Sequence, residues 1–262
     1  MMSRRTIVGL GLLVLIVGSA CGISSQGSTP AAGEGETPTS EPTTEAPMLP
    51  VSINEGLASL DSYRMTYTTD AFDSVTQERS VSTFVVASDA NADASYNRTE
   101  TRVTGEADEV VSEDVQEQYM IGNQLCQVAG GEAELTTMSG PARVMSDLMS
   151  RVVVFKPLIE NPVYIGQDFL SGVPVRTYTF EVRSLGVDSG VEVARADGEY
   201  AIAADGNYLV HYRLDMELRT GTEGDPEAES TVFFIEASLE EINQPVEITF
   251  PSNCQAAESS GG

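Results

Sequence analysis

The sequence predicts an α+β domain in which a long antiparallel meander of strands carries most of the structure. Two observations lead to this prediction: apolar and polar residues alternate over many short segments, and two other stretches place apolar residues at helical spacing. Short turn segments separate most of the alternating runs, which favours neighbouring strands with one polar and one apolar face. About 205 residues lie between Pro50 and Cys254, enough for one domain with a sizeable core.

The first helical stretch covers residues 50–63, "PVSINEGLASLDSY", in which Ile53, Leu57 and Leu60 share one face. Ser52 precedes this face, and serine is a residue type favoured as a helix N-cap. We therefore expect a short helix at the N-terminus of the domain.

The second helical stretch covers residues 139–157, "SGPARVMSDLMSRVVVFKP". Ser139 can cap its start, and Pro157 marks its end because proline cannot continue a helix. Its apolar stripe consists of Val144, Met145, Leu148, Met149, Val152 and Val153. We expect a central helix that lays this stripe on the apolar face of the sheet. The stripe fits an ordinary core, and it also fits the lining of a cavity, since methionine repacks readily around a guest.

The clearest alternation lies in residues 198–219, "GEYAIAADGNYLVHYRLDMELR". One face carries Tyr208, Val210, Tyr212, Leu214, Met216 and Leu218, and the other carries His211, Arg213, Asp215, Glu217 and Arg219. This pattern predicts a half-buried strand, preceded by a hairpin turn at 204–207 where Gly206 and Asn207 tolerate positive φ. Similar runs occur at Tyr63–Phe72, Ser80–Ser88, Ala94–Val103, Val115–Met120, Gln124–Val128, Val173–Val182 and Ser230–Leu239.

Residues 1–20 have the layout of a secretory signal. Arg4 and Arg5 precede an apolar run at 7–17, and small residues follow at 18–20. The apolar run is too short to span roughly 30 Å of hydrocarbon comfortably as a helix. The pattern therefore predicts export rather than a membrane-spanning helix.

Cys21 follows the small residues directly, and this arrangement resembles the lipobox of bacterial lipoprotein precursors. The resemblance implies that Cys21 receives a diacylglyceryl group and anchors the mature chain to the membrane from the extracytoplasmic side. A plain secretory signal with an incidental cysteine is the alternative. Residues 21–49 are rich in Pro, Ser, Thr, Gly and Glu, which predicts a disordered tether with a span of roughly 25–30 Å. The domain itself is expected at 50–254, followed by a flexible tail at 255–262.

The chain carries 40 acidic and 14 basic residues, for a formal net charge of −26. Such a surface repels nucleic acid and anionic headgroups, so neither is an expected partner. Cys126 and Cys254 are the two cysteines besides Cys21. In an exported domain they predict a disulfide rather than a redox or metal site, because the chain has no CxxC motif and a single histidine.

No catalytic, metal or cofactor motif is visible in the sequence. It lacks a Gly-rich phosphate loop between strand and helix, a nucleophile elbow and a metal-spaced histidine pair. His211 lies on the polar face of its predicted strand, and carboxylates are too widespread for one pair to stand out. We therefore predict a protein that is not an enzyme and uses no cofactor.

Five phrases, in their order along the chain, resemble those of the LolA/LolB and LppX/LprG group of envelope lipoproteins. They are "LASLDSYRMTY" (57–67), "QYMIGNQLCQV" (118–128), "GVPVRTYTFE" (172–181), "GEYAIAADGNYLVHYRLDMEL" (198–218) and "EINQPVEITFP" (241–251), the last resembling a closing strand. The resemblance implies a strongly curved, unclosed antiparallel β-barrel, a half-barrel. Its helices would cover the concave apolar face.

The same resemblance implies a cavity for acyl chains between the sheet and the central helix, lined by Val144, Met145, Leu148, Met149 and Val152. Three hypotheses remain open: a carrier of a lipid or other lipophilic molecule, an envelope sensor or protein-interaction module, and a structural surface lipoprotein without a ligand. An apolar cavity of roughly 300–1,000 Å³ favours the carrier. An exposed apolar patch away from that cavity favours the interaction module.

Overall fold

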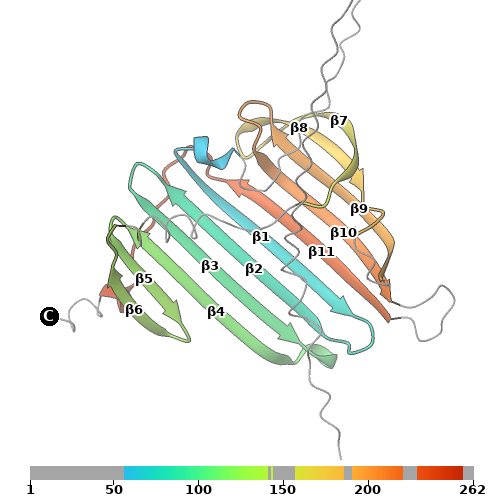
Figure 1. Cartoon of the computed structure of the whole chain (residues 1–262), viewed down its shortest axis with the longest axis horizontal. Coiled ribbons are helices and arrows are strands. Elements are labelled where there is room, and N and C mark those ends of the chain that lie inside the picture. The colour runs from blue at the N-terminus through green and yellow to red at the C-terminus, as the bar shows by residue number, and fades with distance from the viewer. Residues whose placement is uncertain (1–55, 141–142, 144–156, 186–190, 221–228, 256–262) are drawn as a thin grey trace, which may run out of the picture. The chain divides into compact units, whose positions relative to one another are not determined.

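The computed structural model describes residues 56–140, 143, 157–185, 191–220 and 229–255, which build one antiparallel sheet of eleven strands (Figure 1). The strands are β1 (Ser62–Asp73), β2 (Arg79–Asp89), β3 (Ala94–Thr104), β4 (Val110–Ile121), β5 (Gln124–Ala129), β6 (Glu132–Thr137), β7 (Glu160–Leu170), β8 (Val173–Glu181), β9 (Val191–Ala203), β10 (Leu209–Thr220) and β11 (Glu229–Glu240). Two short 3-10 turns, η1 (Leu57–Ser59) and η2 (Glu106–Asp108), and a helical turn at 252–255 are also described.

The strand order is β6-β5-β4-β3-β2-β1-β11-β10-β9-β8-β7, so each strand pairs with its neighbour in the chain and β1 pairs with β11. β6 and β7 are the one pair of consecutive strands that is not hydrogen-bonded, and they form the two edges. The topology is thus that of an up-and-down barrel opened between β6 and β7. It agrees with the predicted half-barrel, and residues 138–159 connect the two free edges.

Strand register separates the sheet into two faces, here called inner and outer. On the inner face, Tyr67 of β1 lies beside Ala237 of β11, which lies beside Tyr212 of β10. On the outer face, Arg213 lies opposite Glu236. Alternation in β10 follows the prediction, since the six apolar residues from Tyr208 to Leu218 are buried and the intervening charged ones are not.

The helix predicted over 50–63 is wrong within its described part. Residues 57–59 form only the single turn η1, and β1 already begins at Ser62. Gly56 has φ +83°, a left-handed conformation that interrupts a helix, and its backbone packs closely against the β9–β10 turn, where an added Cβ would lie 2.9 Å from the Gly206 carbonyl oxygen. Leu57 nevertheless joins the core, as its apolar character suggested.

The predicted central helix at 139–157 falls largely outside the described residues, which exclude 141–142 and 144–156. Arg143 is described and is helical. Pro157 is buried and lies three residues before the start of β7 at Glu160. The extent of this helix therefore remains a prediction.

Both edge strands, β6 and β7, were missed by the sequence analysis. β7 shows no regular alternation, whereas β6 alternates between exposed and half-buried residues from Glu132 to Thr136 without fully burying any side chain. In β7 the pattern is further broken by two register shifts against β8. β4 also begins at Val110, five residues before the predicted run, and its added residues are exposed.

The closing strand predicted from "EINQPVEITFP" is wrong, because β11 ends at Glu240 and the described residues 241–255 form no strand. Glu241 and Asn243 have φ of 53° and 52°, which turns the chain out of the sheet. Since β11 is already paired on both sides, no free edge is available there. Residues 241–255, here called the C-terminal strap, instead cross the outer face (Figure 1).

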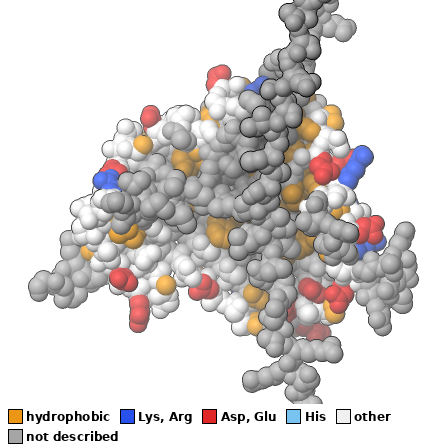
Figure 2. Space-filling model, viewed as in Figure 1, with side chains coloured by type: hydrophobic (Ala, Val, Ile, Leu, Met, Phe, Trp, Pro, Cys, Tyr) orange, Lys and Arg blue, Asp and Glu red, His pale blue; other side chains and the backbone are white. Residues whose placement is uncertain are grey.

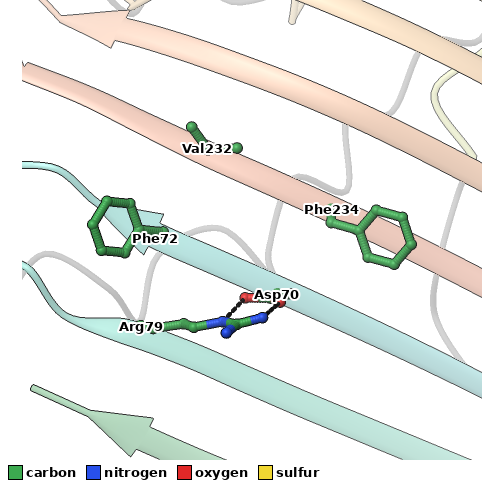
Figure 3. A pocket seen from close by; sticks show the side chains of 5 residues that line it. All are labelled: Asp70, Phe72, Arg79, Val232 and Phe234. Carbon is green, nitrogen blue, oxygen red and sulfur yellow. Dashed lines mark hydrogen bonds and ion pairs between the residues drawn. The ribbon is translucent and has the colours of Figure 1, made fainter. Parts of the chain in front are cut away.

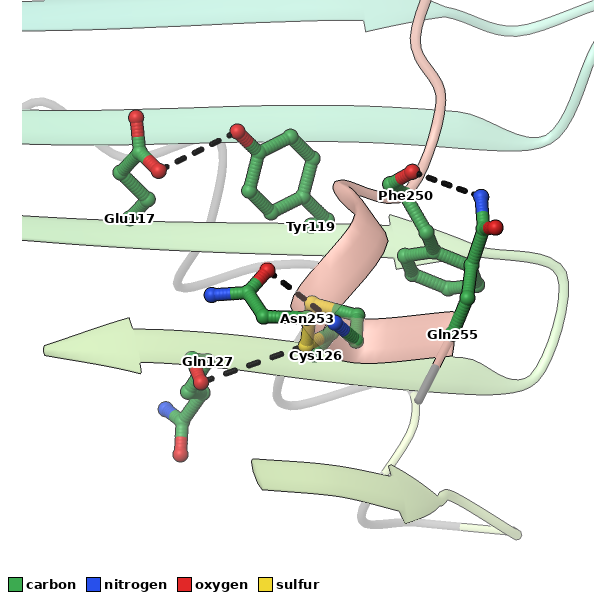
Figure 4. Close-up of a disulfide and its surroundings, with 8 residues drawn as sticks. Glu117, Tyr119, Cys126, Gln127, Phe250, Asn253 and Gln255 are labelled. Carbon is green, nitrogen blue, oxygen red and sulfur yellow. Dashed lines mark hydrogen bonds between the residues drawn. A yellow bond between two sulfur atoms is a disulfide. The ribbon is translucent and has the colours of Figure 1, made fainter. Parts of the chain in front are cut away.

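The strap is attached at both of its ends. Near β1, Arg64 Nε lies 3.0 Å from Glu241 Oε2, and the Asn243 amide donates to the Ser62 carbonyl at 2.9 Å. At the far end, Cys254 and Cys126 of β5 form a disulfide with their Cα atoms 6.1 Å apart (Figure 4). Register aligns Arg64, Ala87, Tyr96, Tyr119 and Cys126 in one row, so the strap runs across the strands from β1 to β5.

Candidate site for a lipophilic ligand

The inner face is strongly apolar over the strands from β8 to β1. Side chains there from five strands are almost completely shielded from solvent. They include Met65, Phe180, Tyr200, Ile202, Tyr212, Leu214, Met216, Ile235, Ala237 and Leu239. Figure 2 shows hydrophobic side chains at several places between the residues drawn in grey, while acidic side chains lie mostly at the rim.

An aromatic row crosses this region from the β7 edge toward the middle of the sheet. It consists of Tyr164, Tyr178, Tyr200, Phe180 and Tyr212, with successive ring centroids 5.5, 5.0, 5.9 and 5.5 Å apart. These separations lie in the range of favourable ring contacts, each worth about 0.5–1.5 kcal/mol beyond area burial. The row therefore presents a continuous and rigid apolar surface.

Gly198 allows the aromatic row to pack against the backbone of β9. Its register partner across the strands is Phe180, and a Cβ added to Gly198 would lie only 2.0 Å from the Phe180 ring. A glycine in the middle of a strand loses side-chain packing, and here that space is filled by the neighbouring aromatic ring. The sequence analysis placed Gly198 in a strand but gave it no role.

Beyond β1 the middle of the inner face becomes polar, although Val86, Met120 and Leu125 on β2, β4 and β5 are still buried apolar side chains there. Register places Thr69, Ser82, Thr101 and Asp114 side by side across β1 to β4, and Ser82 Oγ lies 3.1 Å from Thr101 Oγ1. The Tyr67–Phe84 contact, with centroids 5.8 Å apart, marks the end of the apolar part. An apolar guest would thus be retained on the β8–β1 side of the face.

Two described contacts fix the ends of the segment that joins β6 to β7. The Tyr212 hydroxyl donates a hydrogen bond to the Leu158 carbonyl at 3.1 Å, which holds this end of the segment over the inner face. At the other end, Arg143 forms an ion pair with Asp93 in the turn between β2 and β3. Residues 144–156 connect these two attachment points.

Burial governs the ionisation of the tyrosines on this face. Removal from water raises the pKa of Tyr67, Tyr200 and Tyr212 well above the ordinary value for a phenol. The neutral hydroxyl is therefore the stable form at physiological pH. The site offers neutral donors and apolar rings, with no titrating pair suited to acid–base chemistry.

The predicted lining residues Val144, Met145, Leu148, Met149 and Val152 all lie outside the described residues, as does Cys21. The structure contributes instead the opposite wall, on the sheet. The sequence analysis recognised its β10 members by alternation but missed Tyr178, Phe180 and Tyr200 as a group. Their common feature, aromatic residues on one face of adjacent strands, becomes visible only once the strands are paired.

A second apolar feature lies on the outer face near the ends of β1, β2 and β11. Phe72, Val232 and Phe234 line an open groove of about 320 Å³ together with Asp70 and Arg79, here called the outer groove (Figure 3). Arg79 binds Asp70 through two hydrogen bonds of 2.9 and 2.5 Å. This ion pair raises the pKa of Arg79, chiefly through the hydrogen bonds themselves.

His211 lies on the outer face opposite Ser238 and Ala201, without a catalytic arrangement among the described residues. In the same ranges, no group of three or more His, Cys, Asp and Glu side chains is placed to hold a metal ion. The helices that the structure describes include none with the length and apolar character needed to cross a membrane.

Comparison with known proteins gives matches among solved structures. No family profile matches the chain. No curated protein matches it either. The chain is similar to the lipoprotein LppX of Mycobacterium tuberculosis, with 15% identity over 74% of this chain and 92% of that chain and a TM-score of 0.34.

Two further structures cover a similar share. LprF from Mycobacterium bovis is 12% identical over 76% of this chain and 93% of that chain, with a TM-score of 0.32. A LolA superfamily protein from Nitrosomonas europaea is 9% identical over 76% of this chain and 94% of that chain, with a TM-score of 0.21. These proteins belong to the group that the sequence resembles, and the similarity concerns the fold alone.

Proposed function

We propose that this protein binds a lipophilic molecule between the inner face of its sheet and the segment 144–156, and carries it as a membrane-anchored lipoprotein outside the cytoplasm. The observation that supports this most is the attachment of the segment at both ends, with its Leu158 end held over the apolar, aromatic inner face. Tyr212 holds the segment at Leu158, and Asp93 holds it at Arg143.

The two surfaces are chemically matched. The apolar side chains of the inner face need a cover, because an exposed apolar patch of several hundred Å² promotes association. The stripe with Met145, Leu148 and Met149 supplies flexible side chains that can close on the sheet when empty and repack around a guest. Val144 and Val152 extend the proposed lining at either end of this stripe.

Anchoring through Cys21 completes the proposal. Two acyl chains hold a protein stably at a membrane, at about 0.8 kcal/mol per buried methylene. The tether at 21–49 then lets the domain reach lipids within its span without fixing the orientation of the domain. The expected partners are the membrane and a lipophilic ligand, and the chemistry is binding rather than catalysis.

The test is lipid extraction from the full chain purified from a bacterial envelope. The covalent anchor stays with the protein during organic extraction, so mass spectrometry of the extract counts only non-covalently bound lipid. We expect about one lipid per chain, lost on Leu148→Glu or Met149→Glu. Val111→Glu is the matched control, since Val111 is 57% exposed and lies at the start of β4.

Equal amounts of lipid in all four proteins would show non-specific carry-over and would contradict a binding site. An extract free of lipid from every protein, before and after incubation with lipid vesicles, would contradict the carrier function altogether. The structural lipoprotein without a ligand would then be the remaining reading, unless a partner protein is found.

The outer groove favours one alternative, a sensor or protein-interaction module. Phe72 and Val232 are 36% and 44% exposed beside a pair of opposite charges, Asp70 and Arg79. An apolar centre beside paired charges is typical of an interface core and its polar rim. Phe72→Ser together with Val232→Ser would abolish binding to a partner protein and leave the extracted lipid unchanged.

A further inference from the structure

Among the strand residues that the structure describes, Arg176 is the one basic side chain on the inner face. It lies on β8 two residues before Tyr178 and pairs in register with Ile202 of β9. The other strand arginines all fall on the outer face by alternation: Arg64, Arg79, Arg98, Arg102, Arg195, Arg213 and Arg219. Among the described strands, a positive charge therefore borders the apolar face at one place, next to the aromatic row.

Arg176 has no carboxylate partner in the described part of the chain, despite the excess of 40 acidic over 14 basic residues. Of the nine other arginines there, seven form an ion pair with Asp or Glu, while Arg102 and Arg195 on the outer face form none with the described residues. The Nε atom of Arg176 is shielded from solvent and lacks a hydrogen-bond acceptor. A buried cationic donor without an acceptor is costly, so its retention calls for an explanation.

A second hydrogen-bond donor without an acceptor lies close by on the same face. The hydroxyl of Tyr200 is buried and has no hydrogen-bond partner, although Tyr200 itself is completely shielded from solvent. Tyr200 pairs in register with Tyr178, and the rings of these two residues stack with their centroids 5.0 Å apart. Arg176 and Tyr200 are thus diagonal neighbours on adjacent strands, a relation that brings long side chains within reach of one ligand.

Both unfilled groups are hydrogen-bond donors, and one of them is positively charged. The matching ligand group is an anionic oxygen, as found in a carboxylate or phosphate, for which the planar guanidinium is well suited. The aromatic row that continues from Tyr178 and Tyr200 is completely apolar apart from its hydroxyls. Together they fit an amphiphile with a charged head and an apolar chain.

We propose that Arg176 and Tyr200 hold the anionic head of the bound lipid, whose chain lies along the aromatic row. This inference rests on the proposed carrier function and specifies its ligand class: an anionic amphiphile rather than a neutral one. A single inward arginine selects the ligand by its head. It also gives the ligand one orientation on the sheet.

The test compares hexadecanoate with hexadecan-1-ol, which has the same chain length and a neutral head. Binding to the full chain is measured at about pH 8, where the carboxylic acid is ionised. We expect hexadecanoate to bind about tenfold tighter, the effect of one charge-assisted hydrogen bond. Arg176→Gln should remove this difference by weakening the acid about tenfold and leaving the alcohol unchanged.

Arg195→Gln is the matched control, because this substitution changes the net charge by the same amount and Arg195 lies on the outer face of the adjacent strand. Arg176→Lys keeps the charge and should keep part of the preference for the acid, which separates recognition from a folding defect. Inorganic phosphate alone, as a head without a chain, is expected to compete only weakly. Strong competition by phosphate would overturn the lipid assignment in favour of a free-anion site.

Tyr200→Phe supplies a readout that does not depend on ligand affinity alone. It removes a buried donor without an acceptor, so the ligand-free chain should melt about 2–4 °C higher. The same change should weaken hexadecanoate and spare hexadecan-1-ol.

The outcomes separate the two proposals. Equal affinities for acid and alcohol in the wild-type chain would overturn the anionic head site and leave the carrier function standing. Equal losses in Arg176→Gln and Arg195→Gln would also overturn it, because they would show a general effect of charge. Absence of binding for both probes would overturn the carrier function and the head site together.

Discussion

The phenolic oxygen of Tyr212, in the middle of β10, lies 3.1 Å from the backbone carbonyl oxygen of Leu158, 54 residues earlier in the chain. Tyr212 is completely shielded from solvent, and its ring also stacks on Phe180. One side chain thus belongs to the aromatic row and at the same time fastens the connection between the two open edges of the sheet.

Replacing Tyr212 with phenylalanine should lower the free energy of unfolding by about 1 kcal/mol, since it leaves the carbonyl of the half-buried Leu158 without this donor. Urea denaturation measures the change. Tyr178→Phe is the matched control, because Tyr178 lies in the same row and its hydroxyl makes no hydrogen bond among the described residues. Equal effects of the two variants would contradict a specific anchoring role for Tyr212.

Stability should fall steeply in alkali. Burial raises the pKa of Tyr67 above its ordinary value, as it does for Tyr200 and Tyr212. Above about pH 10 the unfolded chain loses these protons while the folded chain keeps them, so the unfolded state is favoured progressively. The stabilisation that these buried, neutral tyrosines give to the folded state is fully present below about pH 10, and it is lost as the pH rises toward their folded-state pKa values.

Urea denaturation from about pH 8 to 11 gives the slope of the unfolding free energy against pH. Each of these tyrosines should contribute up to about 1.4 kcal/mol per pH unit to that slope. Tyr67→Phe should make the slope shallower. Phe84→Leu, which alters the ring next to Tyr67 without a titrating group, should lower stability equally at every pH. A slope unchanged by Tyr67→Phe would refute the assignment.

Gly198→Ala should destabilise the protein by about 1–3 kcal/mol, the usual cost of inserting a methyl group into a packed core. The new Cβ would meet the Phe180 ring at 2.0 Å, which forces the ring out of the aromatic row. Gly166→Ala on β7 is the control, because a Cβ there meets no atom within 4 Å. Thermal denaturation of both variants distinguishes a packing role for Gly198 from a general effect of glycine.

Loss of the disulfide should cost up to about 4–5 kcal/mol in the chain-entropy model, since Cys126 and Cys254 are 128 residues apart. The double variant Cys126→Ser/Cys254→Ser tests this by urea denaturation, and reduction of the wild-type chain should give the same shift. Amide exchange should increase mainly at the strap around Val246. Uniform loss of protection over the inner strands would instead assign the disulfide to the core.

The sequence predicted the inner strands well and the edges poorly. In β10, every second residue from Tyr208 to Leu218 is apolar because that side is buried against a core, and this alternation can be read without coordinates. β7 lacks the pattern, since edge residues such as Val163 and Phe169 are exposed whatever their character. The helix predicted over 50–63 failed because Gly56 adopts a conformation that the apolar spacing does not reveal.

The candidate site divides in the same way. The stripe at 144–152 was predicted from its spacing along the chain, because a helix brings its apolar residues together by local geometry, and it remains a prediction outside the described residues. The sheet wall was not found as a unit, because Tyr178, Tyr200 and Tyr212 become neighbours only through pairing of separate strands. Arg176 gave no signal in the sequence, since its isolation from carboxylates depends on which face of the sheet it occupies.

The sequence by itself thus determined the antiparallel strand meander and the two faces of its central strands, while the central helix, the signal and the tether remain predictions. It also pointed to the pairing of the two domain cysteines. These features follow from local periodicity and composition. Tertiary structure alone decided that β1 pairs with β11, that the sheet opens between β6 and β7, and that the strap follows β11. It also placed one unpaired arginine beside a row of aromatic rings, because such contacts join residues far apart in the chain.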